Sequence, residues 1–185
     1  MKISLKTNIT PNANGDSRTA DHVPTIEEFK AANLMHINDV NHMAENVAAE
    51  LKARIKRHDW TKSKEPYQTM FYNDLCEAIK GNLVFTDGEW AKLHYEEKER
   101  HHLTKHVPDD VDLFDVFEML IDCVCAGIAR SGGVYPIDIP DEILSAAVKN
   151  TIKELEDSVN IGTFGKDTSS FVNCTSFVNS SSTES

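Results

Sequence analysis

The spacing of apolar residues along the chain predicts a helical protein. Apolar side chains recur at intervals of three and four residues, which places them on one face of a helix. This pattern holds over residues 25–57, 67–80, 89–105, 111–130 and 141–158. We therefore expect an all-α fold, a single helical domain of five or six helices.

Helix start and stop signals flank several of these segments. Thr25 and Glu28 form a capping-box pattern directly after Pro24, and Gly81 and Gly132 each follow the end of a segment, where glycine commonly ends a helix. The first segment is long for a small domain, so we expect a break within it, although no glycine or proline marks the place.

The chain is expected to have three parts. Residues 1–24 are polar and lack a sustained period, so we expect an N-terminal arm that is either disordered or laid across the domain. Residues 25–158 form the helical domain. Residues 159–185 are rich in serine and threonine and are expected to form a flexible tail.

Charge and composition argue against binding to nucleic acid and against insertion into a membrane. The chain has 30 acidic and 19 basic residues, a formal net charge of −11, and its one dense basic patch is residues 52–64. Such a chain disfavours sequence-independent binding of nucleic acid. No apolar run approaches the roughly 20 residues of a membrane span, and no signal peptide is recognisable, so we expect neither membrane insertion nor export. The four cysteines form no C-x-x-C pair, which fits a reducing cytoplasm.

Candidate chemistry lies in imidazoles and carboxylates on successive helices. Mixed nitrogen and oxygen ligands suit Mn, Fe, Co, Ni, Zn or Mg better than a thiolate zinc site. The seven candidate metal ligands are His36, His58, Asp59, His94, His101, Glu118 and Asp122.

Helical spacing brings some of these residues together. His94 and His101 are seven residues apart, so an unbroken helix would place them on one face. Glu118 and Asp122 are four apart and interrupt the most apolar helix, where an unpaired carboxylate is costly and a cation is favoured. Alternatively, these two carboxylates could pair with arginines such as Arg54 in a buried ion network.

The order of these residues resembles the HD-domain superfamily of helical metal-dependent phosphohydrolases. Residues 36 to about 151 look more closely like an uncharacterised HD-like family encoded largely by phages and bacteria. The resemblance implies an HD-like fold with one or two divalent ions held by the candidate ligands, and it supplies no substrate. It is carried by His36 and Val40, Arg54, His58-Asp59-Trp60-Thr61-Lys62, Trp90 with His94-Tyr95, His101-His102, Glu118 to Asp122, Arg130 and Asn150-Thr151.

Three departures from that family pattern affect what the resemblance implies. Thr61 stands where serine is usual but keeps the hydroxyl. Lys98 replaces a frequent asparagine, and Leu103-Thr104 replace Pro-Glu after the histidine pair.

His36 can share an ion with His58 only under one condition, because the 22 residues between them span about 33 Å in an unbroken helix. Either the helix breaks between about 44 and 52, or His36 is not a ligand.

These residues predict a phosphohydrolase that acts on a nucleotide or small phosphoester in the cytoplasm, or in the host cytoplasm if the protein is phage-encoded. A divalent ion would activate water for attack on phosphorus. Lys62 and Arg54 are expected to neutralise phosphate charge, and His102 is expected to protonate the leaving oxygen. Two alternatives stay open: an HD-type di-iron oxygenase, and a non-catalytic phage helical module that binds a partner.

Overall fold

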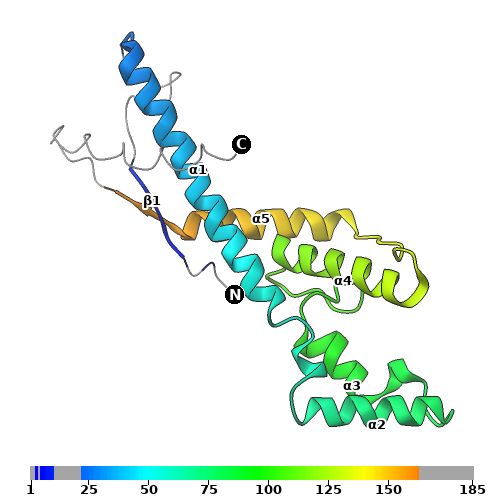
Figure 1. The fold of residues 1–185 in the computed structure, drawn as a ribbon. Coiled ribbons are helices and arrows are strands. Elements are labelled where there is room, and N and C mark those ends of the chain that lie inside the picture. Colours follow the sequence, from blue (N-terminus) through cyan, green and yellow to red (C-terminus); the bar gives the residue numbers. More distant parts are fainter. Residues whose placement is uncertain (1–2, 4, 11–21, 163–185) are drawn as a thin grey trace, which may run out of the picture. The chain divides into compact units, whose positions relative to one another are not determined.

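The protein is mostly helical, as predicted. The computed structural model describes residues 3, 5–10 and 22–162 (Figure 1). Within the described residues, no helix has the length and apolar character that a membrane crossing requires. The elements in chain order are β1 (Thr7–Ile9), α1 (Ile26–Ile55), η1 (Trp60–Lys62), α2 (Tyr67–Ile79), η2 (Phe85–Asp87), α3 (Glu89–Lys92), η3 (Leu93–Lys98), α4 (Leu113–Ser131), α5 (Asp141–Asp157) and β2 (Val159–Ile161).

The chain divides into two compact units. One comprises Met1–Lys6 and His42–Val159, and the other comprises Thr7–Asn41 and Asn160–Ser185. All candidate ligands except His36 belong to the first unit.

A two-stranded sheet joins parts of the predicted arm and tail. Strands β1 and β2 pair, the backbone N–H of Gly162 donates to the carbonyl of Ile9 at 2.9 Å, and the side chains of Asn160 and Asn8 hydrogen-bond at 3.0 Å. This sheet was not predicted from the sequence, because each strand is only three residues long. Residues 163–185 of the predicted tail lie outside the described residues.

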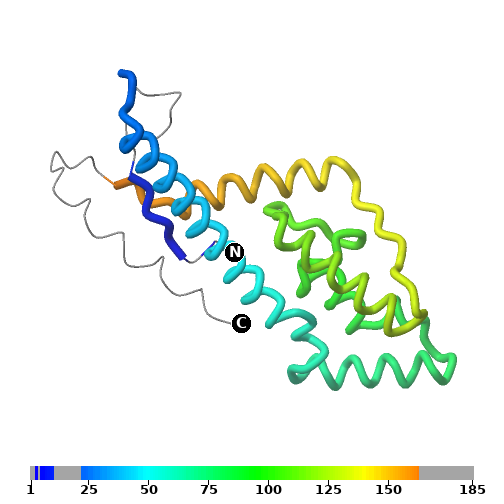
Figure 2. The backbone as a smooth tube through the Cα atoms, turned by 45° about the horizontal axis from the view of Figure 1, so that its top comes forward, coloured from blue at the N-terminus to red at the C-terminus, as the bar shows by residue number. Residues whose placement is uncertain are grey.

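Helix α1 is continuous, so the predicted break is wrong. Its capping box forms as expected, with Thr25 N donating to Glu28 Oε2 at 2.8 Å and Glu28 N donating to Thr25 Oγ1 at 3.2 Å. From Ile26 the helix runs without interruption to Ile55 (Figures 1 and 2). The absence of glycine and proline was therefore the better guide than the usual length of a helix.

The helix predicted over residues 89–105 ends early. After α3 the chain forms η3, a wide π-helical turn, in which Glu99 N donates to the carbonyl of His94 at 3.2 Å. Residues 99–112 then follow without regular secondary structure. At the start of this segment Glu99, His101 and Leu103 are buried at alternate positions, a spacing that an extended chain provides and a helix does not.

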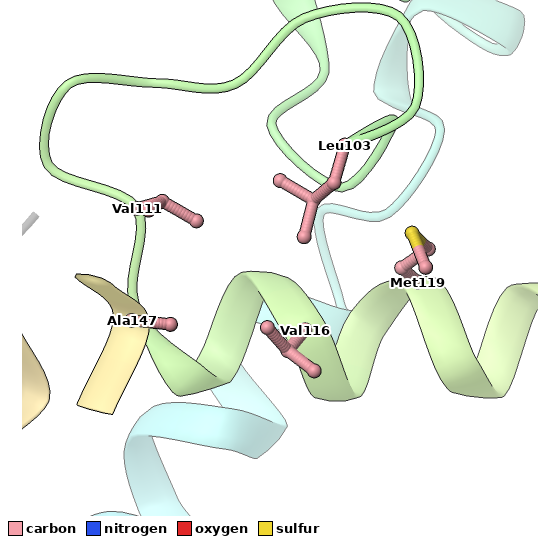
Figure 3. Packing of buried hydrophobic residues seen from close by; sticks show 5 residues of the cluster. All are labelled: Leu103, Val111, Val116, Met119 and Ala147. Atoms are coloured by element: carbon pink, nitrogen blue, oxygen red, sulfur yellow. The ribbon is translucent and has the colours of Figure 1, made fainter. Parts of the chain in front are cut away.

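Two apolar clusters stabilise the first unit. Leu103, Val111, Val116, Met119 and Ala147 form an aliphatic cluster between α4, α5 and the 99–112 segment (Figure 3). Phe71, Phe85 and Trp90 form an aromatic cluster that joins α2, η2 and α3, with the Phe71 and Trp90 ring centroids 4.2 Å apart. The candidate site contacts the aromatic cluster, because His94 stacks on Trp90.

Candidate metal centre

The turn after α1 carries the His58-Asp59 pair. Asp59 has a left-handed backbone (φ 55°, ψ 31°), and among the described residues it is the one non-glycine residue with positive φ. Aspartate tolerates this conformation better than most residues. The turn leads directly into η1, which places Thr61 and Lys62 beside the same cluster.

His58, His101 and Asp122 form the first group that could hold a metal ion. Each offers one ligand atom, and these atoms lie within 4.8 Å of one another. His58 Nε2 is 3.6 Å from Asp122 Oδ1, and the His58 and His101 ring centroids are 4.5 Å apart. The three residues come from the turn after α1, the 99–112 segment and α4.

Asp59, His94 and His102 form the second group, with ligand atoms that again lie within 4.8 Å of one another. His94 Nε2 is 3.4 Å from Asp59 Oδ1 and 2.8 Å from His102 Nε2. His94 is 1% exposed, whereas Asp59 and His102 are partly buried.

The Asp59 carboxylate faces both groups. Its Oδ2 lies 3.3 Å from His58 Nε2 and forms an ion pair with Lys62. Its Oδ1 lies 3.4 Å from His94 Nε2 and 3.8 Å from His101 Nε2. Oδ2 therefore faces the first group, and Oδ1 lies near one histidine of each group.

Some buried polar atoms of the cluster have no hydrogen-bond partner, as expected of a site that could hold a cation. Asp59 Oδ1 and both ring nitrogens of His101 are buried and make no hydrogen bond. Leaving buried polar groups unpaired costs about 1–3 kcal/mol each. A cation between a carboxylate oxygen and an imidazole nitrogen removes that cost, and the donor set of nitrogen and oxygen suits a divalent transition metal.

Glu118 supports the imidazoles. Its Oε1 hydrogen-bonds His58 Nδ1 at 3.0 Å and lies 3.3 Å from His101 Nδ1. Both contacts use Nδ1, which leaves the Nε2 atoms directed toward Asp59. A carboxylate on the remote nitrogen orients a metal-binding histidine. Of the two predicted α4 ligands, Asp122 thus belongs to a ligand group and Glu118 to the support behind it, and both carboxylates face imidazoles.

Contacts within the first group and with Glu118 shift two pKa values in opposite directions. Hydrogen bonds to Asp122, Asp59 and Glu118 raise the pKa of His58 to about 11. Burial acts to raise the pKa of Glu118, but the contacts with His101 and His58 outweigh burial and lower this pKa to about 2.

The second group behaves differently. Burial lowers the pKa of His94 to about 4, and burial together with the neighbouring His101 and His94 lowers the pKa of His102 to about 3. Both rings are therefore neutral at pH 7, the form that binds metal ions.

Two predicted site residues are not brought into the cluster. Arg54 is 5% exposed and pairs with Asp112 at 2.7 Å and Glu50 at 3.2 Å. Its predicted contact with phosphate stays a prediction, and in the structure its guanidinium is already paired with buried carboxylates. His36 is exposed on the continuous helix α1. Since the condition for its participation was a break in that helix, His36 is not among the candidate ligands.

Lys62 and His102 do reach the cluster. Lys62 pairs with Asp59 and also lines a cavity of about 430 Å³ beside α2. His102 joins the second ligand group, whereas the sequence analysis made it a separate proton donor. With a pKa of about 3 its ring is neutral at pH 7 and is not an imidazolium acid, which suits the ligand role.

Sequence reasoning missed the contributions of Thr61 and Glu99. Thr61 Oγ1 lies 2.7 Å from His94 Nδ1 and 3.0 Å from Glu99 Oε1. The hydroxyl of Thr61 was visible in the His-Asp-x-Thr-Lys pattern and could have been assigned a supporting role. Glu99 had no such signal, because its position depends on the π turn.

The fold and the site together define an all-α protein with two adjoining His/Asp groups that could hold a metal ion. Residues 25–173 match the model of a family described as "Family of unknown function (DUF5662)", and the chain belongs to this family. No curated protein and no solved structure matches the chain. The family description names no activity, so a function must be argued from the site.

Proposed function

We propose that the protein is a divalent-metal-dependent phosphohydrolase that acts on a nucleotide or small phosphoester. The observation that carries this proposal is the Asp59 carboxylate, which lies between two groups of metal-capable side chains in a partly buried cluster. The resemblance of the His/Asp order to HD-domain phosphohydrolases agrees with it.

Each of the two groups would hold one divalent ion. His58, His101 and Asp122 would hold one ion, and Asp59, His94 and His102 would hold a second. A bound divalent ion makes a water ligand acidic enough to attack phosphorus near neutral pH and polarises the phosphoryl oxygen.

Lys62 supports a phosphorylated substrate in particular. Its ammonium group lies against Asp59, at the edge of the cluster, and it also lines the cavity beside α2. That cavity has Phe71, Tyr72 and Gln68 among its lining residues. A substrate with its phosphate beside Lys62 could therefore place an aromatic or apolar portion along α2, which suits a nucleotide.

The direct test is phosphate release. Protein stripped with a chelator and reloaded with Mn²⁺ or Co²⁺ is incubated with a panel of nucleotides and p-nitrophenyl phosphate, and phosphate and pyrophosphate are measured. We expect activity that depends on the metal and that Asp59→Asn and Asp122→Asn abolish. Asp109→Asn, a change at an exposed carboxylate, is the matched control and should leave the activity intact.

Other outcomes separate the alternatives. Stoichiometric metal without hydrolysis of any substrate in the panel would contradict the proposal. Iron with a mixed-valence signal in the purified protein would favour the di-iron oxygenase, since the same ligands suit iron. Equal, near-zero metal in the wild type and in Asp59→Asn would favour the non-catalytic module.

A further inference from the structure

A buried hydroxyl connects the second ligand group to an acid behind it. Thr61 Oγ1 lies 2.7 Å from His94 Nδ1 and 3.0 Å from Glu99 Oε1. All three residues are buried, with exposed fractions of 0% for Thr61, 1% for His94 and 7% for Glu99. The three side chains therefore form a chain of hydrogen bonds shielded from water.

The direction of these hydrogen bonds follows from counting protons. Glu99 Oε1 also accepts the backbone N–H of Thr61 at 3.1 Å, so this oxygen is an acceptor on both sides. The Thr61 hydroxyl has a single proton, which it donates to Glu99. Its oxygen can then only accept from His94, and the proton of the neutral His94 ring must be on Nδ1.

The opposite nitrogen of His94 is consequently unprotonated. This Nε2 atom faces Asp59 Oδ1 at 3.4 Å, and that oxygen has no hydrogen-bond partner. Both atoms are acceptors. Without metal, His102 Nε2 at 2.8 Å can donate to His94 Nε2, but the Asp59 oxygen has no donor. Such an arrangement is unfavourable when empty and favourable around a cation.

The plane of the His94 ring is fixed as well. The ring stacks on Trp90, with centroids 4.3 Å apart and an interplanar angle of 17°. Trp90 Nε1 donates to the backbone carbonyl of Thr61 at 3.4 Å. Stacking fixes the ring plane, and the Thr61 hydroxyl fixes which edge of the ring faces Asp59.

We propose that Thr61 and Glu99 are positioning residues, which hold His94 with a proton on Nδ1 and so keep Nε2 unprotonated and able to bind a divalent cation. The purpose of this arrangement rests on the proposed metal-dependent function, but the arrangement itself is testable without metal. A carboxylate that acts on a metal ligand through its second nitrogen raises the affinity of that ligand and fixes its tautomer.

The tautomer is read directly by long-range ¹H–¹⁵N NMR of chelator-treated protein at pH 7. We expect the Nδ1–H form of His94 in the wild type and in Thr61→Ser, which keeps the hydroxyl. Thr61→Val keeps the shape but removes the hydroxyl, and the Nε2–H form should then appear. A wild-type His94 with its proton on Nε2 would overturn the inference.

A second pair of variants keeps the test valid if Thr61→Val folds poorly. Glu99→Gln retains an oxygen that accepts both hydrogen bonds from Thr61, so the Nδ1–H form should persist. Glu99→Met has a similar size but no acceptor, which frees the hydroxyl to donate to His94 instead. Equal tautomer populations in these two variants would contradict a role for Glu99.

Metal affinity gives the functional readout. Titration with Mn²⁺ should show binding about 10–100-fold weaker in Thr61→Val than in the wild type. Thr61→Ser should be close to the wild type, as should Thr86→Val, the same change at an exposed position. Unchanged affinity in Thr61→Val would overturn the positioning role. A wild type with the Nδ1–H form that binds no divalent ion would contradict the proposed function, whereas the tautomer assignment would stand.

Discussion

Three carboxylates surround the imidazole of His58. Glu118 Oε1 is 3.0 Å from Nδ1, and Asp59 Oδ2 and Asp122 Oδ1 are 3.3 and 3.6 Å from Nε2. These neighbours raise the pKa of His58 to about 11. In the absence of metal, the proton on this ring supplies the positive charge that the carboxylates require.

This proton predicts a pH dependence of stability in chelator-treated protein. Because folding raises the pKa of His58, its contribution is fully present below about pH 6.5 and is lost as the pH rises through about 11. We expect the free energy of unfolding to fall by roughly 1–3 kcal/mol between pH 6.5 and 9, as measured by urea denaturation. His58→Asn should flatten this slope, and His106→Asn, at an exposed site, should not. Parallel curves for the wild type and His58→Asn would refute the assignment.

Replacement of Lys62 should lower kcat/KM more than it lowers the affinity for metal. Its ammonium group competes with a metal ion for Asp59, so Lys62→Met should bind Mn²⁺ at least as tightly as the wild type. If Lys62 contacts phosphate, kcat/KM should fall by about 10²–10³-fold, the usual cost of losing one stabilising charge. Steady-state kinetics and metal titration measure the two effects. Lys64→Met, at a nearby exposed lysine, is the control, and equal kcat/KM in both variants would count against a phosphate contact.

Among the elements, α4 is fixed at its beginning by an ion cluster. Asp112 and Asp115 form its capping box. Arg54 of α1 contacts both carboxylates, and Arg100 binds Asp115 at 2.8 Å. Since α4 also carries Asp122, this cluster sets the position of that ligand relative to the turn after α1.

Removal of Arg54 should therefore be strongly destabilising. Arg54→Met leaves buried carboxylates without their partner, which typically costs 3–5 kcal/mol. Denaturant unfolding should show a loss of about this size. Lys52→Met, a change at an exposed lysine in the same last turn of α1, should change stability by less than about 0.5 kcal/mol. A comparable small loss in both variants would exclude a structural role for the Arg54 cluster.

The helices were predictable where apolar residues recurred at helical spacing and a helix stop signal such as glycine followed. Residues 67–80 and 111–130 were predicted, and α2 and α4 occupy 67–79 and 113–131. The region after Lys92 was not predictable, because a π turn has no apolar period of its own and is stabilised here by the burial of His94 and Glu99. The same deviation, rather than helical spacing, brings His101 toward His94.

At the scale of the molecule, the ligands come from the turn after α1, η3, the 99–112 segment and α4. A cation bound to these ligands would link segments that are distant in sequence, and it would bind only the folded state. Its binding free energy would therefore add to the stability of the unit that contains the site.

Thermal unfolding should show this linkage. Mn²⁺ at about 100 times its dissociation constant should add about 2.7 kcal/mol, which corresponds to a rise in Tm of roughly 5–10 °C for a chain of this size. EDTA should reverse the rise. The Mn²⁺-dependent rise in Tm should be absent in Asp122→Asn and present in Asp109→Asn. A Tm independent of Mn²⁺, Co²⁺, Fe²⁺ and Zn²⁺ would be incompatible with a metal centre.

Sequence reasoning identified the site better than it identified the roles within it. His58, Asp59, His94, His101 and Asp122 were predicted from residue types and order, and all five belong to the two ligand groups. Glu118 lies behind the imidazoles, and Arg54 lies in a separate ion cluster. These distinctions depend on which ring nitrogen faces which oxygen, and sequence spacing carries no such information.

The left-handed backbone at residue 59 limits what can replace aspartate there. Glycine would adopt this conformation freely but would supply no oxygen, and glutamate would supply oxygens but adopt it at a cost. Asparagine meets the conformational demand and removes only the negative charge, whereas alanine changes charge and backbone preference together. A difference in folding stability between Asp59→Asn and Asp59→Ala would thus measure the conformational contribution of this position separately from its affinity for cations.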